Sequence, residues 1–148
     1  MEFATIPQTS HRISRVGLGT WAIGGWMWGG TDEEQSVMTI QAAVERGITL
    51  IDTAPAYGFG RSEEIVGHAI SAARLRSRVV IATKTGLEWK DGKVFRNASR
   101  RRILREVTDS LRRLRTDRCI GPTRWCRSKR RPKRCRRSST RGRSALLA

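Results

Sequence analysis

The sequence predicts an α/β fold in which about three βα units form part of a parallel sheet, within residues 1–118. Short apolar runs of strand length alternate there with longer segments whose apolar residues recur at helical spacing. The alternation stops near residue 118, and residues 119–148 consist mostly of Arg, Lys, Ser, Pro and Cys. Such a low-complexity segment offers too little apolar surface to offset the entropy lost on ordering. We therefore expect a partial domain at 1–118, followed by a disordered basic tail.

The first βα unit is expected to begin with a strand at residues 13–18, followed by a loop rich in Gly and Trp. Thr31 is expected to begin the helix, because its hydroxyl can cap free N–H groups while Glu34, three residues later, reaches back to it. Gly47 would end this helix. The residues at helical spacing that would face the core are Val37, Ile40 and Val44.

The second unit would consist of a strand at 48–51 and a helix that begins at Ser62, with Asp52 directly after the strand. Two acidic residues, Glu63 and Glu64, would stand in the first turn of this helix, where the positive end of the helix dipole favours negative charge. The predicted apolar face of the helix is formed by Ile65, Val66, Ala69 and Ile70.

The third unit would be a strand at 78–83 that ends at Lys84, then a loop, then a long helix at 99–114. The predicted apolar face of this helix consists of Ile103, Leu104, Val107, Leu111 and Leu114. No comparable apolar periodicity follows it, so the sequence predicts three units and not more.

The formal net charge of +17 belongs mostly to the tail. Eleven of the 30 Lys and Arg residues lie in 119–148, which contains no Asp or Glu, so residues 1–118 hold 19 basic and 13 acidic residues. The high charge is therefore no reason to expect a nucleic-acid partner for the folded part. Only the tail has the composition to neutralise phosphates.

The sequence favours a cytoplasmic protein without a membrane segment or a metal. The N-terminal segment has an early acid, Glu2, and no apolar core of a signal peptide, and the longest apolar runs are too short to span a bilayer. Three cysteines lie in the tail, and their C-x6-C-x8-C spacing lacks the close pair of a zinc site. These are Cys119, Cys126 and Cys135.

Polar side chains are predicted to gather at the carboxyl ends of the strands, where a parallel barrel places its active site. Asp52 follows the second strand, Tyr57 lies five residues later, and Lys84 ends the third strand. An ammonium group beside a phenol stabilises the phenolate, and a carboxylate beside the ammonium keeps it charged and oriented. The combination produces a tyrosine that can donate a proton near neutral pH, as carbonyl reduction requires of its general acid.

Several motifs in this order resemble the aldo-keto reductases. They are GLGTW (17–21), GITLIDTAPAYGFGRSEEIVG (47–67) and VVIATKTG (79–86). The run WAIGGWMWGGTDEE (21–34) resembles the general stress-type bacterial subgroup of that family, and SLRRLRTD (110–117) also fits. The resemblance covers about 118 residues, and the basic tail lies outside it.

The resemblance implies a (β/α)8 TIM-type barrel and an oxidoreductase that reduces aldehydes or ketones to alcohols with NADP(H). It implies that Tyr57 is the proton donor and that Asp52 and Lys84 tune it. It further implies that the backbone and side chains of three consecutive residues line the mouth where cofactor and carbonyl substrate bind, with Asp52 also at the cofactor site. These three residues are Gly19, Thr20 and Trp21.

The resemblance also implies a catalytic His after the fourth strand, at a place where this sequence reads RCIGPT (118–123). We find neither a His nor a strand pattern there, and His68 lies within a predicted helix as a surface or packing residue. A full barrel takes ~250 residues, so 118 family-like residues cannot close one. We therefore expect an inactive, truncated or frameshifted form of the reductase.

Different interpretations of residues 119–148 stay open. The segment can be an out-of-frame translation, because Arg, Pro, Ser, Cys and Trp without acids are typical of a shifted reading of GC-rich DNA. It can also be a genuine extension that binds nucleic acid on a degraded reductase scaffold, although Trp125 is its only aromatic residue for base stacking. A fragment that binds nothing is the remaining alternative.

Overall fold

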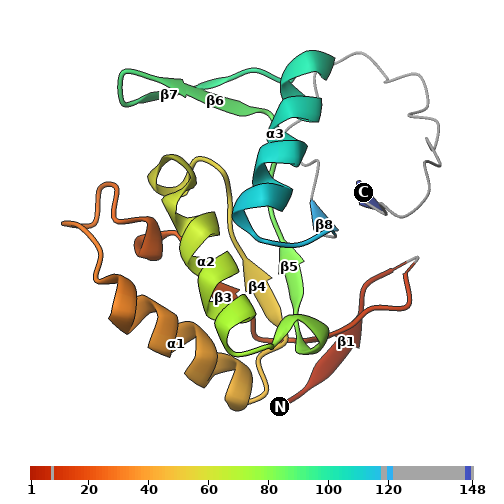
Figure 1. The fold of residues 1–148 in the computed structure, drawn as a ribbon. Coiled ribbons are helices and arrows are strands. Elements are labelled where there is room, and N and C mark those ends of the chain that lie inside the picture. Colours follow the sequence, from red (N-terminus) through yellow and green to blue (C-terminus); the bar gives the residue numbers. More distant parts are fainter. Residues whose placement is uncertain (8, 118–119, 122–145, 148) are drawn as a thin grey trace.

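The computed structural model describes residues 1–7, 9–117, 120–121 and 146–147 (Figure 1). Its central feature is a parallel sheet with the strand order β3–β4–β5–β8–β9. These strands are β3 (Leu18–Gly19), β4 (Leu50–Asp52), β5 (Val80–Ala82), β8 (Ile120–Gly121) and β9 (Leu146–Leu147). The helices are α1 (Glu33–Glu45), α2 (Arg61–Ala72) and α3 (Arg100–Arg113). The three predicted βα units are confirmed as β3–α1, β4–α2 and β5–α3.

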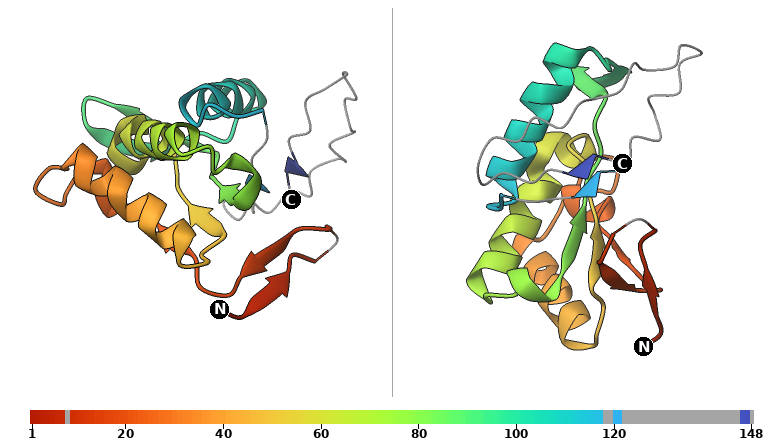
Figure 2. Two further views of the ribbon diagram at one scale, coloured as in Figure 1. Left: turned by 60° about the horizontal axis from the view of Figure 1, so that its bottom comes forward. Right: turned by 90° about the vertical axis from the view of Figure 1, so that its right-hand side faces the viewer.

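All three helices lie on one side of the sheet, and the hairpin formed by β1 (Phe3–Thr5) and β2 (Arg12–Ser14) stands off on the other side (Figure 2). Side chains alternate accordingly along the strands. Ile51 and Ile81 are buried against the helices, whereas Val80 is only half-buried on the opposite face. Parallel sheets are ordinarily covered on both faces. In the described part of the chain, the strands thus form an open portion of a barrel and do not close.

The core lies between the sheet and the helices. The predicted apolar faces of α1 and α2 are confirmed, with Val37 packed at the margin of the cluster. Its fully or almost fully buried members are Ile40, Val44, Ile51, Ile65, Val66, Ala69, Ile70, Leu75, Val79, Ile81 and Leu114.

The predicted first strand at 13–18 is wrong as a single element, because the chain forms two strands there. Residues 12–14 pair antiparallel with β1, and residues 18–19 pair parallel with β4. Ser14 separates them: its hydroxyl donates to the carbonyl oxygen of Val16 at 2.7 Å and accepts from the amide of Thr49 at 2.9 Å. A side chain that forms a hydrogen bond with the backbone two residues later turns the chain locally, and here it ends the pairing of β2 with β1.

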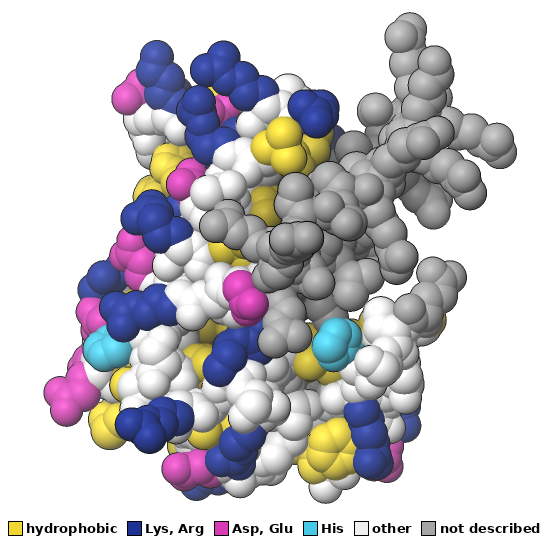
Figure 3. Space-filling view, turned by 45° about the vertical axis from the view of Figure 1, so that its right-hand side comes forward, with side chains coloured by type: hydrophobic (Ala, Val, Ile, Leu, Met, Phe, Trp, Pro, Cys, Tyr) yellow, Lys and Arg dark blue, Asp and Glu magenta, His cyan; other side chains and the backbone are white. Residues whose placement is uncertain are grey.

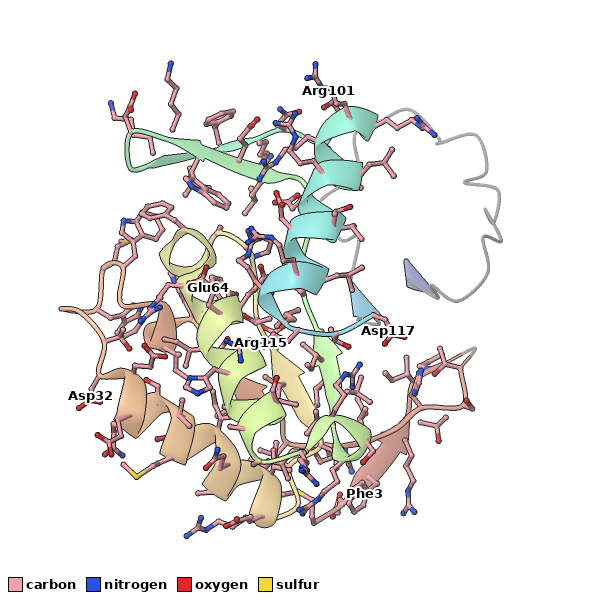
Figure 4. All side chains as sticks on the ribbon, viewed as in Figure 1. Phe3, Asp32, Glu64, Arg101, Arg115 and Asp117 are labelled. Atoms are coloured by element: carbon pink, nitrogen blue, oxygen red, sulfur yellow. The ribbon has the colours of Figure 1, made fainter. Side chains whose placement is uncertain are left out.

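The N-terminus of α1 begins one residue later than the capping box predicted. Asp32, at the start of the helix in Figure 4, is the cap, and its carboxylate accepts from the amide of Gln35 at 2.9 Å. Thr31 instead contacts the hydroxyl of Ser36 at 3.3 Å. At the other end, Gly47 has a φ of +90°, as a glycine that ends a helix should.

The segment between β5 and α3 was predicted as a loop, but it forms an antiparallel hairpin of β6 (Leu87–Lys90) and β7 (Lys93–Arg96). The two turn residues, Asp91 and Gly92, both have positive φ, at 49° and 73°. Asp-Gly is a favoured pair for such a two-residue turn, so the signal was present in the sequence.

The long third helix is confirmed, and its predicted apolar face is confirmed in part, because Ile103, Val107 and Leu111 are only half-buried. The fully buried residues are Glu106, Ser110 and Leu114, whereas Leu104 is 53% exposed. The C-terminal end of α3 packs closely on α2. A Cβ at Gly67 of α2 would overlap the backbone carbonyl oxygen of Arg113, so the two helices meet with almost no side chain between them.

Glu63, expected only to benefit from the dipole of α2, is fully buried. Its Oε2 accepts from Nε of Arg113 on α3 at 2.7 Å, and its Oε1 accepts from the hydroxyl of Thr83 at 2.6 Å. The carboxylate therefore joins α2, α3 and the end of β5. This burial was not predicted, because an acidic residue in the first turn of a helix is usually solvated.

Glu106 of α3 is a second buried carboxylate. Its Oε2 accepts from the amide of Gly86 at 2.7 Å, and its Oε1 accepts from Nη2 of Arg102 at 3.3 Å. Burial raises the pKa of Glu106 above the ordinary value of 4.5, while the amide of Gly86 and the charge of Arg102 act in the opposite direction.

The fourth position of the sheet corrects another expectation. Although no strand was predicted at 118–123, Ile120 pairs parallel with Ala82 as part of β8, and Leu146–Leu147 pairs with β8. The remaining tail residues lie outside the described part, so the predicted disorder stays a prediction.

On the face that Figure 3 shows, Lys and Arg are scattered with Asp and Glu among them. No described helix has the length and apolarity to cross a bilayer.

The close approach at Gly67 predicts a strong effect of a single methyl group. We expect Gly67→Ala to lower the free energy of unfolding by about 2–3 kcal/mol, because the backbone of α3 must move away from α2. Urea unfolding measures this loss. His68→Ala, on the exposed side of the same turn, is the control and should change stability little. Equal stability of Gly67→Ala and the parent chain would contradict the described packing.

The raised pKa of Glu106 predicts a pH dependence with a definite sign. A folded-state pKa above the unfolded value means that the folded chain binds the proton more tightly, so this group stabilises at low pH and loses that contribution as the pH rises. The test is to measure the free energy of unfolding of the parent chain and of Glu106→Gln by urea unfolding, from neutral pH down toward pH 4.5. The parent should gain relative to the variant as the pH falls, and a constant difference would disprove the perturbation.

Candidate active site

Asp52 and Lys84 meet at the carboxyl ends of two neighbouring parallel strands. Asp52 is the last residue of β4 and lies opposite Ala82 of β5, two residues before Lys84. The ammonium of Lys84 donates to Oδ1 and Oδ2 of Asp52 at 2.9 and 2.7 Å, and to the carbonyl oxygen of Thr53 at 3.0 Å. Parallel pairing thus brings two residues that are far apart in sequence together as one ion pair at the carboxyl ends of the strands.

Tyr57 completes the predicted trio. The Nζ of Lys84 lies 4.9 Å from the centroid of the Tyr57 ring, in cation–π geometry. The ring of Tyr57 also stacks on Trp21, with 6.0 Å between centroids and 22° between planes. The structure therefore brings the three predicted catalytic residues together, with the ammonium between the carboxylate and the phenol ring.

The turn that carries Tyr57 is fixed by a close contact between two backbones. A Cβ at Gly58 would overlap the carbonyl oxygen of Gly24, and a Cβ at Gly24 would collide with the Tyr57–Gly58 peptide. Phe59, next in the turn, holds a φ of +56°, which a bulky residue rarely adopts. Neither glycine was recognised from the sequence as part of the site.

Aromatic packing supports this turn from the outside. Phe59 lies 5.0 Å from Trp26 and 5.9 Å from Trp89 between ring centroids. Trp89 belongs to β6, and the guanidinium of Arg102 on α3 lies 5.4 Å from its ring. The hairpin that the sequence did not predict therefore connects α3 to the loop that carries Tyr57.

The predicted cofactor residues differ in their accessibility. Gly19 ends β3 with open space where a Cβ would stand, and the indole of Trp21 is 47% exposed. Thr20 corrects the expectation for its side chain, because the residue is fully buried. Its hydroxyl donates to the carbonyl oxygen of Asp52 at 3.0 Å and accepts from the hydroxyl of Ser62 at 2.8 Å. Its side chain joins two strand ends and a helix start, and does not line the mouth.

One side of the site is accessible at Gly19 and Trp21. Gly19 leaves room beside the sheet edge, and the exposed indole of Trp21 offers an aromatic surface above Tyr57. His68, expected to be a surface or packing residue, is exposed, and its Nδ1 lies 3.3 Å from Oε1 of Glu33. Within the described residues, no cluster of His, Cys, Asp and Glu has the arrangement of a metal site.

Comparisons with a family model and with curated proteins point to the same family. The sequence model of the Aldo/keto reductase family matches residues 15–119. The aldo-keto reductase YhdN of Bacillus subtilis is 62% identical over 117 residues, which are 79% of this chain and 35% of that protein. The NADH-specific methylglyoxal reductase of Escherichia coli is 44% identical over 121 residues, which are 74% of this chain and 37% of that protein.

Solved structures agree with the fold. The glycerol dehydrogenase of Gluconobacter oxydans is 52% identical, with a TM-score of 0.72 over 82% of this chain and 38% of that one. An aldo-keto reductase of Klebsiella pneumoniae in complex with NADPH is 33% identical, with a TM-score of 0.60 over 76% and 35%. The chain spans about a third of the length of the relatives that it matches. Its sequence and fold place it in the aldo/keto reductase family.

Proposed function

We propose that this chain carries the proton-donor part of the active site of an NADP(H)-dependent carbonyl reductase. The observation that carries the proposal is the contact of Lys84 with both the Asp52 carboxylate and the Tyr57 ring, at the carboxyl edge of a parallel sheet. The names of two relatives support carbonyl chemistry, since one is a methylglyoxal reductase and another a glycerol dehydrogenase. The substrate class is an aldehyde or a ketone, and the product is the alcohol.

In the proposed reaction, Tyr57 acts as the general acid. Its hydroxyl donates a proton to the carbonyl oxygen of the substrate while the carbonyl carbon takes up a hydride. NADP(H), when bound, would supply this hydride. The oxygen of Tyr57 is left as a phenolate, and the charge of Lys84 stabilises it. Asp52 holds the ammonium in place through two hydrogen bonds. The phenol is reprotonated from solvent before the next turnover.

The nicotinamide end of the cofactor is assigned to the open space beside Gly19, next to Trp21. The support is that Gly19 has no neighbour where a side chain would stand. One relative is named NADH-specific and another was solved with NADPH, so relatives of this chain use both nucleotides. We retain NADP(H) for this chain on the resemblance to the stress-type subgroup.

The 148-residue chain should not turn over by itself. The catalytic His that the family resemblance implies has no counterpart at 118–123. We therefore expect no oxidation of NADPH above the background rate when the chain is mixed with reactive aldehydes, measured by absorbance of the nicotinamide. Steady turnover that depends on the chain would show that the 148 residues already hold a complete site.

The role of Tyr57 is testable in a graft. In this hybrid, residues 1–117 would replace the corresponding part of the Bacillus subtilis relative. The two sequences are 62% identical over 117 residues. We expect this hybrid to oxidise NADPH with aldehydes, and Tyr57→Phe to lower kcat by about 10²–10⁴-fold, the usual contribution of a general acid, with unchanged cofactor affinity. Phe59→Tyr is the matched control. Normal turnover of Tyr57→Phe would refute the assignment.

A further inference from the structure

The segment that carries Lys84 leaves the sheet before Lys84 is reached. Strand β5 ends at Ala82, whose carbonyl oxygen accepts from the amide of Thr53 at 2.8 Å as a final contact between β4 and β5. Residues 83–86 then run on toward the β6–β7 hairpin, and Gly86 has a φ of +95°. The pairing of β4 with β5 therefore does not fix the backbone on either side of Lys84. At Gly86 the carbonyl oxygen accepts from the amide of Asn97 at 3.0 Å, next to the β6–β7 ladder, and the remaining contacts of the segment come from side chains.

Two buried carboxylates supply hydrogen bonds to this segment, one on each side of Lys84. Oε1 of Glu63 accepts from the hydroxyl of Thr83 at 2.6 Å. Oε2 of Glu106 accepts from the amide of Gly86 at 2.7 Å. One carboxylate comes from α2 and the other from α3, so the segment is held from two different helices.

Each carboxylate uses its other oxygen for an arginine of α3. Glu63 pairs with Arg113 at 2.7 Å, and their side chains are 0% and 9% exposed. Glu106 pairs with Arg102 at 3.3 Å, and their side chains are 0% and 12% exposed. The two sites thus have the same composition: a buried carboxylate, an arginine that compensates its charge, and one bond to the segment 83–86.

Stability alone gives no reason for this arrangement. Removing two charges from water is costly, and well-packed apolar residues in place of a buried ion pair are often as stable or more stable. What apolar residues cannot do is accept a directed hydrogen bond from a hydroxyl or an amide. Glu63 and Glu106 each use one carboxylate oxygen to accept a hydrogen bond from the segment 83–86, and this shared feature needs an explanation.

We propose that Glu63 and Glu106 are positioning residues that hold Thr83 and Gly86, and so aim the ammonium of Lys84 at Asp52 and Tyr57. Neither carboxylate touches the reacting groups. Both act through the backbone on which Lys84 stands, with α3 as the rigid support. The inference deepens the proposed function by naming what orients its lysine.

The test measures the segment directly on the full 148-residue chain, without turnover. Hydrogen exchange followed by mass spectrometry reports the amides of 83–86, and pulse labelling with an amine-reactive reagent reports the accessibility of Lys84. We expect Glu106→Ala to raise both rates about tenfold, as the loss of one buried hydrogen bond implies. Glu106→Gln should restore the rates of the parent chain, because its amide oxygen can accept from Gly86.

Asp109→Ala is the control, because Asp109 stands on the same helix as Glu106 and pairs with the exposed Arg112, at 3.9 Å. It should leave exchange at 83–86 unchanged. A purely structural role would accelerate the amides of α1 to the same extent as those of 83–86. That result would overturn the proposal, as would unchanged rates in Glu106→Ala or equally fast exchange in Glu106→Gln.

A second pair of variants serves where Glu106→Ala does not fold. Thr83→Val removes the hydroxyl that donates to Glu63, and Thr83→Ser keeps it. Faster labelling of Lys84 in the valine variant alone supports the proposal, and equal labelling in both variants contradicts it. Because no readout depends on NADPH, failure here is distinct from failure of the graft to reduce aldehydes.

Discussion

The rest of the structure depends on the buried ion pair between Glu63 and Arg113. It connects the first turn of α2 to the last turn of α3, and through Thr83 it reaches the end of β5. Breaking such a pair by removing one partner costs about 3–5 kcal/mol, because the remaining charge stays buried. Gly67, one turn later, lets the two helix backbones touch. Charge and close contact together fix α3, which otherwise buries few apolar side chains.

The site follows from the same arrangement. Parallel pairing of β4 and β5 places the Asp52 and Lys84 ends side by side, and the contact between the turns at Gly24 and Gly58 places Tyr57 over them. The ion pair of the trio therefore depends on the strand order, and the position of Tyr57 depends on the packing of the two turns.

The sequence predicted what periodicity and strand ends encode. The order of βα units, the cores of α1 and α2, and the grouping of Asp52, Tyr57 and Lys84 could be anticipated, because each depends on local pattern and parallel pairing. It did not predict the burial of Glu63 and Glu106, since a charged residue is assigned to the surface unless its partner is known. The hairpin around Asp91–Gly92 had a readable signal that polar flanking residues obscured. Thr20 looked like a mouth residue because its role is set by a distant hydroxyl, that of Ser62.

Helices on one side of the sheet also have a thermodynamic consequence. The heat-capacity increment of unfolding grows with the apolar surface that becomes exposed, and half-buried residues such as Val80, on the face that no described helix covers, contribute little to it. The enthalpy of unfolding at the midpoint is reduced for the same reason. We therefore expect a chain built in this way to have a shallow stability curve and a broad thermal transition.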